Sequence, residues 1–254
     1  MNQLPSQATF GSSRIIRFLS ELNVANVEIS HQHFVERLGQ LIDFSGSITL
    51  ASTHHGLSAT SFDSKPYSLE EVKALFLRVR SVMVQSIVKS TTPNADDEAR
   101  RLPNPNIGDS LETLTGFDAY RRFYGVMQRD MDTKIRNLRL QIRQEMSGVS
   151  PKLAQLCHLD SVLSDTLFAN TRQFFAVITR LLNKRFDYLL QAHRDAVEKQ
   201  QASDNPAEWI ASGGWLEQFY KEIQGLLLAE LEVRLQPVLG LMEALMKEVE
   251  TIND

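Results

Sequence analysis

The chain has 254 residues, 43% of them hydrophobic and 23% charged, with a formal net charge of −4. These proportions are typical of a globular protein with a sizeable core, and the acidic balance argues against nucleic acid or an anionic membrane as the main partner. A single cysteine, Cys157, excludes an internal disulfide and a cysteine-based metal cluster, and it fits a reducing cytoplasm.

The first ten residues are polar and lack the basic and apolar regions of a signal peptide. The longest uninterrupted apolar runs are far shorter than the roughly 20 residues that a helix needs to cross a bilayer. We therefore expect a soluble, cytoplasmic protein with no direct membrane insertion.

Two short helices are predicted near the N-terminus. Apolar residues at helical spacing follow Ser12 and again Ser30, and serine is a favourable N-cap. Residues 48–51 predict a further helical turn, although their Ile and Thr content also allows a strand. Residues 57–67 are rich in turn formers and predict a loop.

A capping box begins the next predicted helix, because Ser68 is followed three residues later by Glu71. Its apolar stripe ends before Thr91. Residues 91–115 hold three prolines and few apolar residues, and so long a segment is unusual inside a compact domain. We therefore predict a small N-terminal helical unit over residues 1–90 and a linker over residues 91–115.

The strongest helical pattern lies in the second half of the chain. Residues 117–146 carry apolar side chains at steps of three and four. Ser150 and Pro151 then supply an N-cap and a proline at the first helical position, and the helix that they begin could run to about Gln200.

In the helix that follows Ser150, the polar residues Asp160 and Asn170 occupy positions that would otherwise be apolar. The last helix alternates steps of three and four between its apolar residues, which averages to the coiled-coil period of about 3.5 residues. This predicted interaction seam consists of Leu228, Leu231, Leu235, Val238, Met242, Leu245, Val249 and Ile252. Pro237 lies inside the pattern and predicts a kink.

Together these patterns predict an all-α fold, in which residues 116–254 form a long-helix bundle or an antiparallel coiled-coil-like unit. Residues 117–147 carry a net charge of +3 and residues 214–254 carry a net charge of −5. Opposite charges favour two helices that are antiparallel neighbours or that meet across a dimer. Both helices could instead face water, since exposed ion pairs contribute only about 0–1 kcal/mol each.

Four of the six histidines lie early in the chain, at His31, His33, His54 and His55. A metal site needs three or four converging ligands, but side chains two residues apart on a helix point about 200° apart. His31 and His33 therefore diverge, and we predict neither a metal nor a cofactor. A metal-dependent protein or enzyme that uses these histidines remains an alternative.

Other catalytic patterns are weak. Cys157 and His158 are adjacent, and adjacent helical side chains do not face each other, so a buried, inert cysteine is favoured. The Gly213-Gly214 pair lacks the lysine and spacing of a phosphate loop, and the sequence contains no nucleotide fingerprint or nucleophile elbow. We predict no catalytic residue and no enzymatic activity.

Arg121 and Arg122 lie among aromatic residues, a combination that binds nucleic acids. Tyr120 and Tyr124 nevertheless fall on one helical face, which favours a core stripe flanked by arginines. Nucleic-acid binding through the basic helix at residues 117–147 remains a second alternative.

Trp209 and Trp215 stand on either side of the Gly213-Gly214 turn. They could form an aromatic clamp that fixes the angle between two helices. They could equally be a hot spot for a partner, where tryptophan is enriched.

Several blocks of the sequence resemble a proteobacterial domain-of-unknown-function family of helical proteins. The blocks are residues 14–19, 34–38, 120–124, 159–163, 182–186, 213–216 and 228–238. The last block is the most specific, because Pro237 follows an otherwise helical run. The resemblance implies no activity, cofactor or catalytic residue. Members of that family are encoded near stator-like membrane proteins and OmpA-like peptidoglycan-binding proteins, which implies a cytoplasmic accessory of an envelope-spanning complex.

We therefore interpret the chain as a non-enzymatic helical adaptor or assembly protein. It is expected to bind a protein partner, such as a membrane-complex subunit, or to associate with itself as a homodimer. Nucleic acid is not expected as a partner.

Overall fold

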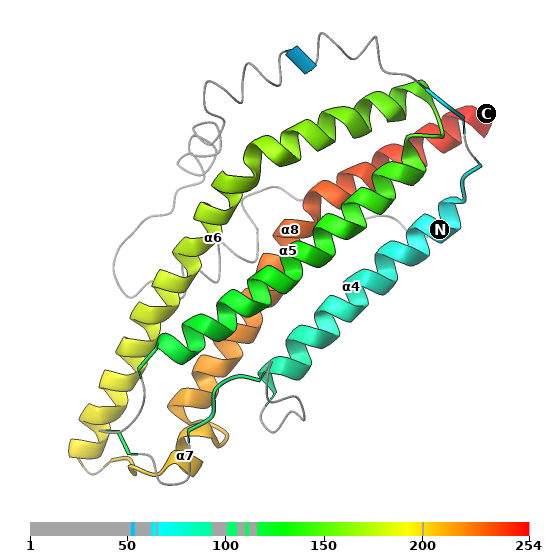
Figure 1. Ribbon diagram of the computed structural model, residues 1–254. Coiled ribbons are helices and arrows are strands. Elements are labelled where there is room, and N and C mark those ends of the chain that lie inside the picture. The colour runs from blue at the N-terminus through cyan, green and yellow to red at the C-terminus, as the bar shows by residue number, and fades with distance from the viewer. Residues whose placement is uncertain are drawn as a thin grey trace. The chain divides into compact units, whose positions relative to one another are not determined.

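The computed structural model describes residues 52–53, 62–64, 66–92, 101–105, 110–111, 116–199 and 201–253. In these residues the chain forms helices and no strand, so the predicted all-α fold is confirmed (Figure 1). The helices are α4 (Leu69–Thr91), α5 (Asp118–Met146), α6 (Pro151–Glu198), α7 (Pro206–Ile210) and α8 (Trp215–Asn253). None of them has a stretch that is long and apolar enough to cross a membrane.

Some predicted features lie outside the described residues. These are the two helices after Ser12 and Ser30, the turn at residues 48–51, and all four of the early histidines, His31, His33, His54 and His55.

The predicted helix starts are confirmed by their caps. The backbone N–H of Glu71 donates to Ser68 Oγ at 3.3 Å, one half of the predicted capping box. The N–H of Leu153 likewise donates to Ser150 Oγ at 3.2 Å, and Pro151 is the first residue of α6. Both serines satisfy backbone donors that a helix leaves without an internal acceptor.

The chain divides into two compact units, and each of the four long helices contributes one part to each unit. Of the described residues, unit 1 holds those within Met83–Met131 and Ala176–Val233. Unit 2 holds those up to Val82 and those within Asp132–Phe175 and Arg234–Asp254. The division by sequence into residues 1–90, 91–115 and 116–254 stays a prediction.

In unit 1, α5 and α8 are neighbours that run parallel. Tyr120 of α5 packs edge-on against Phe219 of α8, with ring centroids 5.4 Å apart. One turn later Tyr124 donates its hydroxyl to Glu230 at 2.8 Å. Because the residue numbers rise together along both helices, the antiparallel pairing expected from their opposite charges is wrong here.

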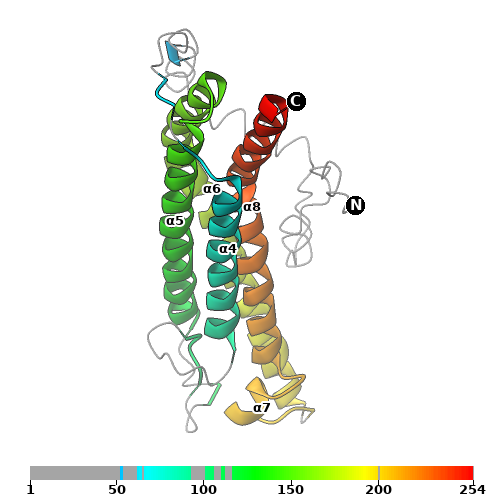
Figure 2. The same ribbon diagram turned by 90° about the vertical axis from the view of Figure 1, so that its right-hand side faces the viewer.

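The antiparallel partner of α8 in unit 1 is α6, which carries the chain back. Arg185 Nη2 of α6 pairs with Glu222 of α8 at 2.7 Å. Further along α6, His193 stacks on Trp215, at the start of α8, with centroids 5.9 Å apart. The α4 segment lies beside α8, where Gln224 Nε2 donates to Thr91 Oγ1 at 2.7 Å (Figure 2).

Described parts of the predicted linker make specific contacts in unit 1. The N–H of Leu102 donates to the carbonyl of Ser90 at 3.0 Å. Tyr220 Oη donates to the carbonyl of Pro103 at 2.6 Å, and burial raises the pKa of this tyrosine well above its usual range. Leu102 is itself buried, so this stretch of chain is fixed by both hydrogen bonds and apolar packing.

Each unit has its own core. Unit 1 is built around the ring of Phe117, just before α5, and aromatic rings from α5, α6 and α8, namely Tyr120, Phe186, Trp215, Phe219 and Tyr220. Unit 2 buries Phe76 and mainly aliphatic side chains, among them Val72, Leu138, Ile142, Leu153, Val238 and Leu245. Pro237 is exposed on α8 without ending the helix, and the kink predicted there stays a prediction.

Candidate functional site

The predicted interaction seam on α8 lies mostly inside the chain. Leu231, Leu235, Val238, Met242, Leu245 and Val249 are buried. Leu228 is half-buried, and Ile252 is 53% exposed. The six buried side chains therefore complete the cores of their own units, and only the two ends of the seam are open. Use of the seam by a second molecule stays a prediction.

The two tryptophans of the predicted clamp do meet. Trp209, the fourth residue of α7, and Trp215, the first residue of α8, are both buried, with ring centroids 6.1 Å apart. The turn between them depends on glycine. Gly213 has a φ of 88°, a backbone conformation that residues with a side chain rarely adopt. A Cβ atom at position 214 would collide with the backbone carbonyl of Trp209.

His193 of α6 is a third member of this aromatic group, and sequence analysis missed it. Its ring lies 6.2 Å from that of Trp209 and 5.9 Å from that of Trp215. Burial lowers the pKa of His193, although Asp204 and the Ser203 backbone act in the opposite direction. The side chain is therefore a packed, neutral imidazole near pH 7.

A signal for His193 was present in the sequence. It continues the core stripe of α6 that runs through Leu182, Phe186 and Leu189, in steps of three and four. The Nε2 atom and both indole nitrogens are buried with no hydrogen-bond partner among the described residues. The three rings are thus held by packing rather than by mutual hydrogen bonds.

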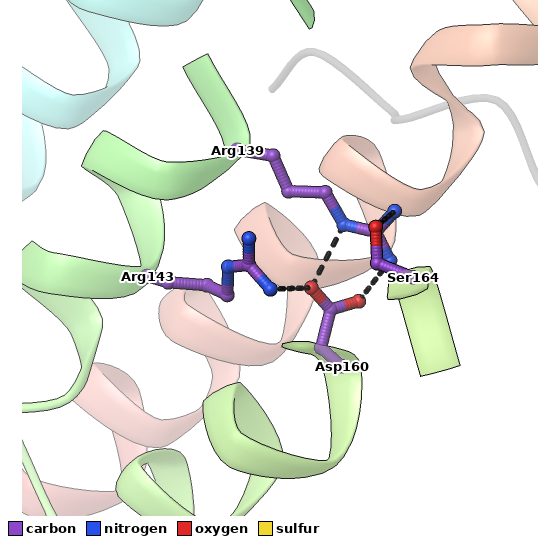
Figure 3. Close-up of polar contacts among 4 residues, drawn as sticks. All are labelled: Arg139, Arg143, Asp160 and Ser164. Carbon is purple, nitrogen blue, oxygen red and sulfur yellow. Dashed lines mark hydrogen bonds and ion pairs between the residues drawn. The ribbon is translucent and has the colours of Figure 1, made fainter. Parts of the chain in front are cut away.

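A cluster of four polar residues joins α5 to α6 in unit 2 (Figure 3). Arg139 forms a bidentate ion pair with Asp160, in which Nε donates to Oδ2 at 2.8 Å and Nη2 pairs with Oδ1. Arg139 Nη1 also donates to Ser164 Oγ at 3.2 Å. Arg143 lies on the other side of the carboxylate, with Nη1 3.6 Å from Oδ2. Two guanidinium groups therefore share one carboxylate.

This cluster is largely removed from water, since the side chains of Arg139 and Arg143 are each 14% exposed and that of Asp160 is 11% exposed. It explains the polar residue predicted in the α6 stripe at Asp160. The side chain of Asn170, the other such residue, lies outside the described part of the structure. A forked arginine–carboxylate pair is directional, so the cluster fixes how α5 and α6 align.

Cys157 lies one turn before Asp160 and is buried. Burial, assisted by the nearby carboxylate of Asp160, raises the pKa of the thiol to about 11, although Arg143 opposes the shift. Because the thiolate is the nucleophile, this environment suppresses cysteine chemistry. The prediction of a buried cysteine is confirmed.

Glu230 is a fully buried carboxylate in unit 1 that sequence analysis also missed. It accepts hydrogen bonds from Tyr124 Oη at 2.8 Å and from Gln128 Nε2 at 3.0 Å. Its position on α8, three residues after the buried Leu227, places it on a core stripe. A carboxylate can occupy a core position at tolerable cost only where hydrogen-bond donors satisfy it.

The side chains on either side of Arg121 and Arg122 lie as predicted. Tyr120 and Tyr124 are buried, while both arginines are exposed. Within the described ranges, no three or more His, Cys, Asp or Glu side chains are grouped so that they could hold a metal ion.

A comparison with known protein families matches residues 1–247 to one family, described as a protein of unknown function (DUF3348). Searches of curated proteins and of solved structures found no match. The family match covers nearly the whole chain, so the chain belongs to the DUF3348 family.

Proposed function

We propose that this protein is a non-enzymatic helical adaptor or assembly protein that binds a protein partner through the outward faces of its long helices. The observation that carries the proposal is a second apolar line on α4. The core face of this helix is already occupied by side chains such as Met83 and Ile87, which are buried.

The second line consists of Leu77, Val84 and Val88, at spacings of seven and four residues. Leu77 is 60% exposed and Val88 is 41% exposed, whereas Val84 is half-buried. Exposed apolar side chains that are scattered singly need no explanation. Two exposed side chains and a half-buried one on one line of a helix whose core face is already filled are instead typical of a surface that another helix covers.

The resemblance drawn from the sequence favours a partner in an envelope-spanning membrane complex, with this chain on the cytoplasmic side. A homodimer that uses the same line is the other form of this proposal. Both forms predict that the line is covered when the protein is assembled.

The test compares the double variant Leu77→Asp and Val88→Asp with a control, Arg78→Asn, whose side chain is exposed on another side of the same helix. Both proteins should retain the helical circular dichroism of the parent. The double variant should lose the partner recovered by cross-linking in the native host, or should change from dimer to monomer by light scattering. Recovery of the same partner and the same mass with both variants would remove the support for the proposal.

A further inference from the structure

The polar cluster that joins α5 to α6 carries a surplus of positive charge. All four of its residues lie in unit 2 (Figure 3). Arg139 and Arg143 each bring a positive charge, whereas Asp160 brings a single negative charge. Ser164 is neutral, so one positive charge is left over. Arginine keeps its proton in proteins, so the cluster cannot remove this charge by deprotonation, as a buried lysine can.

The surplus is concentrated on Arg143. All three side-chain nitrogen atoms of Arg139 are already engaged by Asp160 and Ser164. Arg143 Nη1 instead lies 3.6 Å from Asp160 Oδ2, which is too far for a hydrogen bond. This nitrogen is buried and has no hydrogen-bond partner among the described residues. A buried donor without an acceptor is costly, because it has lost its water without gaining another partner.

Two features of the fold offset this cost only in part. Arg143 lies in the last turn of α5, where the helix dipole favours a cation. Asp160 also attracts Arg143, but both oxygen atoms of this carboxylate already pair with Arg139. The dipole of one helix end stabilises a cation by less than a buried, unpaired cation costs. A second anion would remove the imbalance.

We infer that the cluster binds a small oxyanion through Arg143, either a phosphate group or a carboxylate group. A guanidinium group presents parallel N–H donors that match two oxygen atoms of either group. The side chains of the two arginines and Asp160 are 11–14% exposed. This narrow exposure admits a small solute and excludes the surface of a folded partner. The inference goes beyond the proposed adaptor function and does not depend on it.

The test measures urea unfolding of the full-length chain by circular dichroism in sodium phosphate, in sodium acetate and in sodium chloride alone. Ionic strength is held constant with sodium chloride. The phosphate and acetate concentrations stay below about 20 mM, so that the general stabilisation of proteins by such salts is small. A bound anion adds about 1.4 kcal/mol for each tenfold increase above its dissociation constant, which should raise the urea midpoint by about 0.5 M.

The comparison of the salts distinguishes the two groups. A midpoint that rises in phosphate or in acetate, relative to chloride alone, supports the inference. The salt with the larger rise then identifies the group that the cluster prefers. A midpoint that is the same in all three salts overturns the inference.

The variant Arg143→Met separates anion binding from a purely structural role. Methionine keeps much of the side-chain stem and leaves Arg139 and Asp160 as a neutral pair. In chloride alone its urea midpoint should equal or exceed that of the parent, and it should not respond to phosphate or acetate. The matched control Arg136→Met, exposed on α5 in the same unit, should respond as the parent does. A retained response in Arg143→Met, or a lower midpoint in chloride alone, overturns the inference.

A second measurement locates the anion on the parent protein. Heteronuclear NMR resolves the Nε–H signals of arginine side chains, and the signal of Arg143 is identified by its absence in Arg143→Lys. This signal should shift saturably with phosphate or acetate, while that of Arg180, which is exposed on α6, should change little. Shifts that are confined to exposed arginines overturn the inference.

Discussion

The substitution Asp160→Asn tests whether the α5–α6 polar cluster stabilises the fold. Asparagine keeps the shape of the side chain but removes the charge that Arg139 and Arg143 share. It leaves two guanidinium groups, each only 14% exposed, with Ser164 Oγ as their remaining neighbour in the cluster. The cost therefore comes mainly from cations that are left without their anion in a poorly hydrated place.

The expected loss follows from the burial of the cluster. Removing one partner of a buried ion pair costs about 3–5 kcal/mol. The asparagine oxygen still accepts one hydrogen bond, so we expect a loss of about 2–4 kcal/mol in the free energy of unfolding. The matched control is Asp165→Asn on the exposed side of α6, which should change the same quantity by less than about 0.5 kcal/mol.

Urea unfolding followed by two probes measures the effect and locates it. Far-ultraviolet circular dichroism reports all helices, whereas the only two tryptophans, Trp209 and Trp215, belong to unit 1 and Asp160 belongs to unit 2. With a denaturant dependence of about 3 kcal/mol per molar urea, the circular dichroism midpoint should fall by about 1 M. A tryptophan transition that stays in place would show that unit 1 unfolds separately.

A midpoint shift in Asp160→Asn no larger than that of Asp165→Asn would refute the reasoning, because the cluster would then contribute no net stability. A second variant separates charge from packing. Replacing Asp160 by Leu, together with Arg139→Met and Arg143→Leu, should restore stability to near the parent value, since apolar residues of similar size can replace a buried ion triad. If the triple variant is as unstable as Asp160→Asn, buried charge is not the cause.

Leu245→Asp should unfold unit 2 or lower its free energy of unfolding by more than about 4 kcal/mol, because it buries a carboxylate in an apolar core. Ile252→Asp changes an exposed residue of the same seam, so it should change this free energy by less than about 0.5 kcal/mol. Similar urea midpoints for the Leu245→Asp and Ile252→Asp variants would show that Leu245 is not packed in the core. Cys157 should react with iodoacetamide at pH 8 about 100-fold more slowly than a free thiol, since its pKa of about 11 leaves little thiolate; a fast reaction of the folded protein would refute this. Because the pKa of His193 is lowered in the folded protein, the unfolded chain binds the proton more tightly than the folded chain does. The free energy of unfolding should therefore not depend on His193 above a pH of about 6.5, and it should fall as the pH drops below that value. Urea midpoints at pH 7.5 and 5.5 should show a smaller loss in His193→Phe, and an equal loss would exclude this histidine as the cause.

The helices of the second half of the chain could be predicted because their signals are local. The steps of three and four along α5, and the Ser150-Pro151 start of α6, depend only on residues close in sequence. The role of the α8 seam could not be predicted in the same way. An apolar stripe has the same period whether its own chain or a second molecule covers it, and only the structure shows that Leu231 and Leu245 are buried within their own units.

Net charge was a poor guide to which helices meet and in which direction. Residues 117–147 are basic overall and residues 214–254 are acidic overall. Yet in unit 2 the ion pair between α5 and α8 joins Asp132 of the basic helix to Arg234 of the acidic helix. Single pairs are selected by position along each helix, and the summed charge of a helix does not record position. The predicted antiparallel direction of α5 relative to α8 was wrong for the same reason.

The polar residues that the sequence left unexplained are those that fix the helix register. A purely apolar stripe allows a neighbouring helix to slide by one turn at modest cost, because one leucine can replace another. Glu230 in unit 1 and Asp160 in unit 2 cannot slide in this way, since each would lose donors that meet it at one position only. A buried polar group of this kind specifies register at some expense of stability. The register of each unit is therefore set from inside by α5, α6 and α8. The exposed residues Leu77 and Val88 of α4 belong to neither group, so this face can be substituted to test partner binding without disturbing the register.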